Sequence, residues 1–227
     1  MAHHIPTNYI EITKQMTDVE TRIAVNPGRV EWAGDNPGIY LRESPDGPWT
    51  GLGIFFRVLF SAHGQGSAMI ILGDPAKAQG FPDARNLCIT TNIEMTRFLV
   101  QDFVSRFPSF RSQPALDAIT WLEAESHRSD GDMNTSWTET MTASGCEARM
   151  HWAELGEPFA VEVTPKDCAT GIHDMYSVFL EARTASISVN GESLSGRVCE
   201  RVFFGREMST AFLAVSETWV LPATTQI

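Results

Sequence analysis

The sequence is poor in cationic residues, and it gathers none of them into a run. Lysine and arginine together number 17 against 28 aspartate and glutamate residues, so the formal net charge is −11. Nucleic-acid binding depends on clustered Lys and Arg that neutralise phosphates, and anionic membrane surfaces attract the same clusters. We therefore expect neither a nucleic acid nor a membrane among the partners of this chain.

Long apolar runs are also missing. The most apolar segment, residues 51–60, is interrupted by Arg57 and is too short to span a bilayer. The first residues, Met-Ala-His-His, lack the basic and then apolar pattern of a secretory signal peptide. These features predict a cytoplasmic protein.

Cysteine is scarce, and its spacing suits neither a disulfide framework nor a metal site. The four cysteines, Cys88, Cys146, Cys168 and Cys199, are scattered and form no C-x-x-C pair. A cytoplasmic protein keeps such thiols reduced, so we expect four free thiols. Zinc needs clustered ligands, and we expect no metal.

Several catalytic motifs are absent as well. The sequence has no G-x-G-x-x-G after a strand, no P-loop, no G-x-S-x-G elbow and no H-E-x-x-H. Nucleotide-dependent and common hydrolase chemistries are therefore disfavoured, and no cofactor is expected.

The chain does contain many short β-type runs separated by turn residues. It also carries thirteen Phe and six Trp residues, enough large apolar side chains for a core or a pocket wall. The expected strands cover residues 23–25, 29–33, 39–43, 49–62, 67–72, 119–127, 137–142, 146–154, 159–164, 175–189, 196–204 and 210–221. Asn190-Gly191 is the strongest hairpin signal among the turns.

One amphipathic helix is predicted at residues 92–107. Thr91-Asn92-Ile93-Glu94 has capping-box spacing, and Pro108 ends the segment. Apolar residues then recur at helical spacing, namely Met95, Leu99, Val100, Phe103, Val104 and Phe107. Phe98 falls on the polar side, where it could pack under a loop or face a ligand.

Sequential hairpins with a single helix predict a mainly β fold, either an antiparallel barrel or a tightly rolled sandwich. We favour the barrel, because the last three strands are long and open edges would need protection. All 227 residues are assigned to one domain, since all-β domains reach this size undivided. Residues 1–46 are expected to form an N-terminal extension that contributes short strands.

Gly47-Pro48-Trp49, which leads into a long strand, resembles the G-x-W opening of the calycin families, including lipocalins and fatty-acid-binding barrels. The resemblance implies a barrel with an internal apolar cavity. It also implies that the Trp packs against an arginine of the last strand. Arg197 and Arg201 are the nearest candidates, on the penultimate strand.

The last three strands carry the candidate catalytic residues. A two-residue turn at Asn190-Gly191 pairs Val189 with Glu192, and this register places Glu181 opposite Glu200. Arg183 then lies diagonally beside Glu200, so one carboxyl of this cluster could have a raised pKa. The alternative is an ion network on a solvated face.

Other candidates are chosen for their neighbours. His173 and Tyr176 begin a long strand at the expected barrel mouth and could be second proton carriers, although His173 could equally be an ordinary loop histidine. The expected ligand-binding residues are Trp121, Glu123, Phe179, Glu217 and Trp219. Glu217 is expected to share one strand face with Leu213, Val215 and Trp219.

These features favour acid–base chemistry on a small hydrophobic metabolite, of the hydratase, dehydratase or isomerase type. Glu200 would be the carboxyl with the raised pKa, with Glu181 and Arg183 as its electrostatic partners. The alternative is a non-catalytic carrier of an apolar small molecule. The sequence leaves open whether the chain is a monomer or a homodimer.

Overall fold

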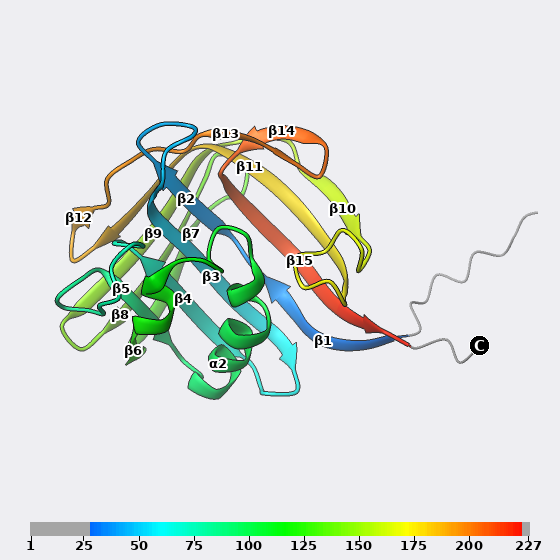
Figure 1. The fold of residues 1–227 in the computed structure, drawn as a ribbon, viewed down its shortest axis with the longest axis horizontal. Coiled ribbons are helices and arrows are strands. Elements are labelled where there is room, and N and C mark those ends of the chain that lie inside the picture. Colours follow the sequence, from blue (N-terminus) through cyan, green and yellow to red (C-terminus); the bar gives the residue numbers. More distant parts are fainter. Residues whose placement is uncertain (1–27, 224–227) are drawn as a thin grey trace, which may run out of the picture.

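The computed structural model describes residues 28–223. The strand expected at residues 23–25 lies outside this range. Within it the protein is mainly β, as predicted, with a 13-stranded sheet and a separate 2-stranded sheet. Figure 1 shows the large sheet as a strongly curved layer.

Most strands of the large sheet follow one continuous path, and three strands pair beside it. In spatial order the path is β6 (Thr120–Glu123), β5 (Asn86–Thr90), β4 (Gly66–Leu72), β3 (Trp49–Ser61), β1 (Gly28–Asp35), β15 (Ala211–Pro222), β11 (Asp174–Val189), β9 (Cys146–Leu155), β8 (Ser136–Ala143) and β7 (Ser126–Gly131). The strands beside the path are β2 (Gly38–Arg42), β10 (Phe159–Val163) and β12 (Glu192–Ser193).

The sheet is mixed, because β5 and β6 pair in parallel. A purely antiparallel sheet was therefore a wrong prediction at this pair. The segment between the two strands contains the helices, and a crossover of that kind returns the chain in the same direction.

The two ends of the sheet path meet at one short chain segment. β6 and β7 are the end strands, yet they follow each other in sequence. The amide of Ala124 donates to Thr90 O of β5 (2.9 Å), and that of Glu125 donates to Thr142 O of β8 (2.8 Å). The strand predicted at residues 119–127 is thus split between opposite ends of the path.

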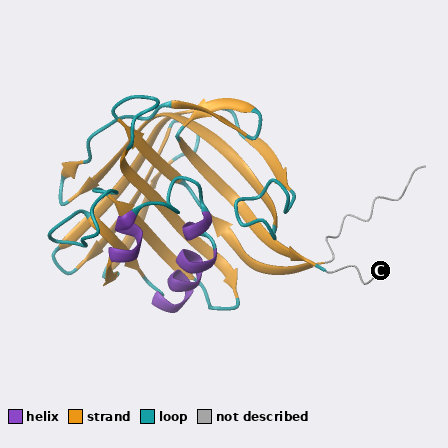
Figure 2. Ribbon diagram, in the orientation of Figure 1, coloured by secondary structure: helices purple, strands orange, loops and turns teal. Residues whose placement is uncertain are grey.

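Apolar side chains form two cores, one on each face of the curved sheet. The inner core lies on the concave face, where Ile187 and Met150 reach across to Gly53 of β3. The helix-side core lies on the other face, under the helices that Figure 2 shows gathered there. Phe55 points into the inner core and Ile54 into the helix-side core. Burial on both faces explains the continuous apolar run of β3.

The predicted helix begins as expected but is shorter. It forms α2 (Ile93–Asp102), and its N-cap is Asn92, whose side chain accepts from the amide of Met95. The capping box predicted from Thr91 and Glu94 was wrong, because the Thr91 hydroxyl accepts from the amide of Ser67 instead. Phe103 leaves helical geometry and packs edge-on against Trp32 and Trp219. Two 3₁₀ turns follow, η1 (Val104–Arg106) and η2 (Pro114–Ala118).

Phe98 packs against the ring of His63 in the β3–β4 turn. Among the described residues, none of these helices has the length and apolarity needed to cross a bilayer.

The hairpin at Asn190-Gly191 is confirmed, but its predicted register extends for only two pairs. Val189 pairs with Glu192 and Ser188 with Ser193, after which the chain leaves β11. From residue 174 to 181, β11 is already paired with β15 and largely with β10. At Glu181 one edge of β11 is paired with Phe212 of β15, and on the other edge the amide of Gly156 donates to Glu181 O (2.8 Å), so Glu181 does not pair with Glu200.

The segment predicted as a long strand at residues 196–204 forms half of the small sheet. β13 (Glu200–Phe203) pairs with β14 (Arg206–Ser209) and with no strand of the large sheet. Its base is held at Thr210, whose amide donates to Cys199 O (2.8 Å) and whose hydroxyl donates to Tyr40 O (2.6 Å). This hairpin covers part of the helix-side core.

Trp49 opens β3, as the G-x-W motif predicts, but its cationic partner differs from the calycin pattern. The guanidinium of Arg42, on β2, lies 3.5 Å from the ring centroid of Trp49. Arg197 approaches only through a backbone bridge to Arg42, and Arg201 lies elsewhere.

All four cysteines are free thiols.

Candidate functional site

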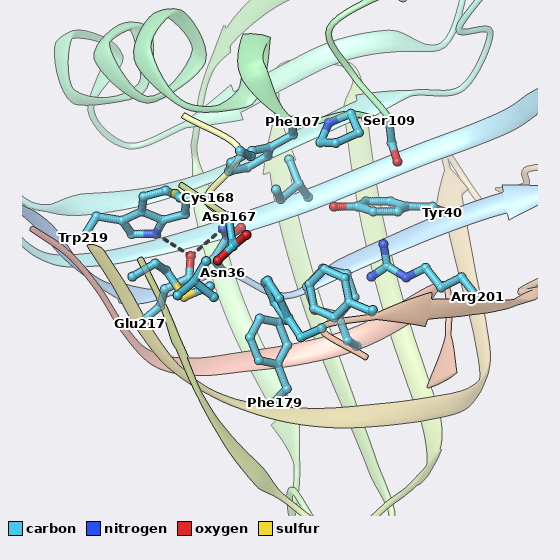
Figure 3. A pocket seen from close by; sticks show the side chains of 18 of the residues that line it. Asn36, Tyr40, Phe107, Ser109, Asp167, Cys168, Phe179, Arg201, Glu217 and Trp219 are labelled. Carbon is cyan, nitrogen blue, oxygen red and sulfur yellow. Dashed lines mark hydrogen bonds between the residues drawn. The ribbon is translucent and has the colours of Figure 1, made fainter. Parts of the chain in front are cut away.

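A cavity of about 370 Å³ lies on the helix side of the sheet, in the size range of small-molecule sites. Its sheet wall comes from β2, β3, β11 and β15, and includes Ile54, Phe179 and Phe212. Its cover is formed by Phe107 and its neighbours, the loop at residues 167–169 and the β13–β14 hairpin. Figure 3 shows aromatic rings on both sides of this space. The cavity is therefore mostly apolar and is separate from the inner core.

A bulge in β15 directs Glu217 into the cavity. Tyr176 pairs with Thr218 and Val178 with Val215, so two residues of β15 oppose Ser177 alone. Ser216 supplies the extra residue, in left-handed backbone geometry with φ of 54°. Bulges re-aim side chains in this way, and they are common next to active sites.

The bulge also corrects a prediction. Leu213 and Val215 contact the inner core, whereas Glu217 and Trp219 face the cavity on the other side of the sheet. The four residues therefore do not share one face, because the extra residue shifts the alternation by one position.

Glu217 is a buried carboxyl with only one of its oxygens engaged. Its Oε1 accepts hydrogen bonds from Trp219 Nε1 (2.7 Å) and Asn36 Nδ2 (3.0 Å), as Figure 3 shows. Oε2 has no hydrogen-bond partner among residues 28–223, and the whole residue is 2% exposed. Ser177 lies nearby, with its hydroxyl outside hydrogen-bond geometry.

Burial raises the pKa of the Glu217 carboxyl to about 7. The charge of Asp35 adds to this rise, and the side chains of Asn36, Trp219 and Ser177 oppose it. Both protonation states are therefore populated near neutral pH, which is the condition for a group that takes and returns a proton.

Arg201 forms the opposite end of the cavity in Figure 3. Its guanidinium lies over the rings of Phe203 (4.2 Å), Phe212 (5.3 Å) and Tyr40 (5.5 Å). Its Nε and Nη2 atoms are buried without a hydrogen-bond partner. Burial lowers the pKa of Arg201, while Tyr40 opposes this effect.

Tyr40 contributes a phenol between these two ends. Burial raises the pKa of Tyr40 to about 12, although the charge of Arg201 opposes the rise, so its hydroxyl stays protonated at neutral pH. No described residue forms a hydrogen bond with the hydroxyl, and Figure 3 shows it pointing from the Arg201 end toward the Glu217 side. The phenol is thus available as a donor to a bound ligand.

The structure brings three of the predicted ligand-binding residues together in this cavity, namely Phe179, Glu217 and Trp219. The predicted catalytic cluster lies outside it. Glu200 and Arg183 are exposed, and Glu181 Oε1 accepts from the amide of Ser209 (2.7 Å). The three do not meet as predicted, because β15 takes the place expected for residues 196–204.

The remaining predicted residues lie around the cavity or away from it. His173 is buried behind Trp219, with Nδ1 2.9 Å from Thr170 Oγ1, and burial lowers the pKa of His173. Tyr176 follows the cavity-lining Met175 and so points to the opposite face of β11. Trp121 packs near Arg97, and Glu123 is exposed beside a separate depression near Ala143.

A second polar cluster, on the inner face, was not predicted. Glu139 is 1% exposed, and its oxygens accept from Arg57 Nη2 (2.8 Å), Trp137 Nε1 (2.9 Å) and Ser129 Oγ (2.7 Å). His127 Nε2 lies 2.7 Å from the same carboxylate. Both Glu139 oxygens are engaged by these side chains, so we interpret this cluster as a structural network. No group of three or more metal-ligating side chains occurs among residues 28–223.

Comparisons of the chain with protein-family models, with curated proteins and with solved structures found no match. The function is therefore inferred from the chemistry of the cavity itself.

Proposed function

We propose that this protein is an acid–base enzyme of the hydratase, dehydratase or isomerase type that acts on a small hydrophobic molecule in the helix-side cavity. The observation that carries the proposal is Glu217, a buried carboxyl with one unengaged oxygen on the wall of an apolar cavity. Glu217 takes the role first assigned to Glu200, which is exposed.

The proposed reaction uses Glu217 as a proton carrier. Asn36 and Trp219 hold Oε1, which leaves Oε2 to remove a proton from a ligand carbon. Returning that proton to another carbon completes an isomerisation, whereas giving it to a leaving hydroxyl releases water and completes a dehydration. The apolar walls limit competing water at this oxygen.

Tyr40 is the proposed electrophilic partner. Its phenol remains protonated at neutral pH and has no hydrogen-bond partner among the described residues. It can therefore donate to a ligand oxygen on which negative charge develops as Glu217 removes the proton.

We also propose that the curved sheet is a calycin-like barrel. The proposal is supported by the meeting of the sheet's two ends at Ala124 and Glu125, and by Trp49 at the start of a long strand. In this barrel the ligand site lies between the sheet and its helical cover.

The test is deuterium incorporation from D₂O into a panel of small apolar carbonyl and enoic compounds, followed by proton NMR. We expect wild-type protein to catalyse exchange, and Glu217→Gln to lower the rate by about 10² or more. Glu200→Gln, which changes an exposed carboxylate outside the cavity, is the matched control and should exchange at the wild-type rate.

Two results would contradict the enzyme proposal. If the Glu217→Gln variant exchanged deuterium at the wild-type rate, Glu217 would not be the proton carrier. Binding of apolar compounds without any exchange by wild-type protein would instead identify a carrier.

A further inference from the structure

Arg201 is a partly buried cation without a counter-charge among the described residues. None of its guanidinium nitrogens donates to an acceptor among the described residues, and Nε and Nη2 are shielded from solvent. No carboxylate within residues 28–223 forms a salt bridge with it. Aromatic rings stabilise the face of a guanidinium, but they leave its in-plane N–H donors unsatisfied. Burying such a group unpaired is costly, so a partner from outside the chain is expected.

The charges around the cavity indicate where an anion would bind. Arg201 stands at one end, while Glu217 and Asp167 line the other end, as Figure 3 shows. An anionic group is attracted to the first end and repelled from the second whenever Glu217 is ionised. The cavity therefore favours one orientation of an anionic ligand.

The wall between the two ends is apolar. Phe179, Phe203 and Phe212 pack around it, with centroid separations of 5.3 Å for Phe179–Phe203 and 5.5 Å for Phe179–Phe212. This aromatic surface suits an apolar or aromatic ligand body, while the Tyr40 phenol also lies between the two ends.

We infer that the ligand of this cavity is an apolar carboxylate, whose anionic group binds Arg201 while its apolar body extends toward Glu217. Nη1 is the guanidinium nitrogen that is not shielded from solvent, so it is the donor open to a carboxylate oxygen, and such a bond is charge-assisted. The inference rests on the cavity being the ligand site proposed above. It adds that Arg201 sets both ligand class and orientation, so the reacting carbon lies at the end remote from the carboxylate.

The test compares an acid with its neutral amide. The fluorescent, uncharged probe N-phenylnaphthylamine reports occupation of the cavity, and phenylbutyrate and phenylbutyramide are its competitors. The two competitors share size and apolar body, so their ratio of inhibition constants isolates recognition of the charge. We expect the acid to displace the probe at least about tenfold more effectively than the amide.

Variants show which residue recognises the charge. Arg201→Met should bring the acid and the amide to within about twofold of each other, and Arg201→Lys should retain part of the preference. The matched control is Arg206→Met, on the same hairpin, whose guanidinium lies over Phe159 outside the cavity. This control should keep the wild-type ratio.

Failure of the inference has a different signature from failure of the proposed function. Equal displacement by acid and amide in wild-type protein would show that Arg201 only anchors the hairpin to the aromatic rings. If the Arg201→Met variant still bound the acid more tightly than the amide, the carboxylate would bind at a residue other than Arg201. Both results concern binding alone, whereas the proposed function fails by loss of the Glu217-dependent exchange.

Discussion

The side-chain amide of Asn36 donates a 3.0 Å hydrogen bond to Glu217, across 181 residues of sequence. The residues next to them are joined as well, because the amide of Ser216 donates to Asp35 Oδ1 (3.2 Å). The turn after β1 is thus fixed to the bulge of β15 by two adjacent bonds. The proposed proton carrier is held in place only once the first and last described strands have paired.

Replacing Glu217 should change how stability depends on pH. The folded-state pKa of about 7 exceeds the ordinary value of 4.5, so the folded protein holds the proton more tightly than the unfolded chain. The stability that the Glu217 carboxyl contributes to the folded protein is fully present below about pH 4.5 and is lost as the pH rises through about 7. The loss is on the order of 3 kcal/mol. In urea denaturation, the unfolding free energy of wild type minus that of Glu217→Gln should fall between about pH 5 and pH 8.

Other titrating groups cancel in this difference. Burial lowers the pKa values of His151 and His173, so these residues add stability as pH rises, and they do so in both proteins. A difference that stays flat over the same range would show that the Glu217 pKa is not raised.

Trp219→Phe should raise the pKa of Glu217 further. The indole N–H donates to Oε1 at 2.7 Å and so stabilises the ionised form. Loss of a hydrogen bond to a charged group corresponds to a shift of about one pKa unit. The measurement is a ¹³C NMR titration of the Glu217 carboxyl. Trp137→Phe, which removes a donor to Glu139 instead, should leave that midpoint unchanged.

Glu139→Gln should destabilise the fold without affecting ligand binding. The change leaves Arg57 without one of its two carboxylate partners, and breaking a buried pair costs about 3 kcal/mol. Glu147→Gln, at an exposed position, should cost less than about 0.5 kcal/mol. Displacement of N-phenylnaphthylamine should match wild type in both variants. Weaker binding in Glu139→Gln alone would mean that the inner-face network supports the cavity.

Asn92→Ala should cost about 1–2 kcal/mol of stability. The Asn92 side chain caps Met95 N and also donates to the carbonyls of His63 and Gln65. Glu94→Gln is the comparison, because the Glu94 side chain is 82% exposed. Thermal unfolding that ranks Glu94→Gln as the more damaging change would contradict the assignment of Asn92 as the cap.

Local chemistry explains the parts of the fold that were predicted. Asn190 and Gly191 adopt φ of 51° and 79°, the left-handed geometry that an Asn-Gly hairpin requires. β9 alternates between buried and exposed residues along most of its length, as its sequence indicates. Such features depend on neighbours within a few residues, so they can be recognised without the rest of the chain.

The site depends on contacts that local patterns do not contain. The bulge at Ser216 arises where β15 pairs with β11, and serine carries no signal for left-handed geometry. Glu200 was placed wrongly because β10 and β15 occupy the edges of β11, a competition among distant segments. The sequence suggested Arg201 only as a partner of Trp49. No local sequence pattern indicated that Arg201 would pack among aromatic rings.

The β13–β14 hairpin supplies Arg201 and Phe203 to the cavity, yet it shares no ladder with the large sheet. Substitutions at its tip leave the hydrogen bonds that define the sheet intact. The proposed ligand preference thus depends on a segment that lies outside the hydrogen-bond ladders of the large sheet. Exchanging residues at the hairpin tip would therefore vary the proposed ligand preference while the ladders of the sheet remain in place.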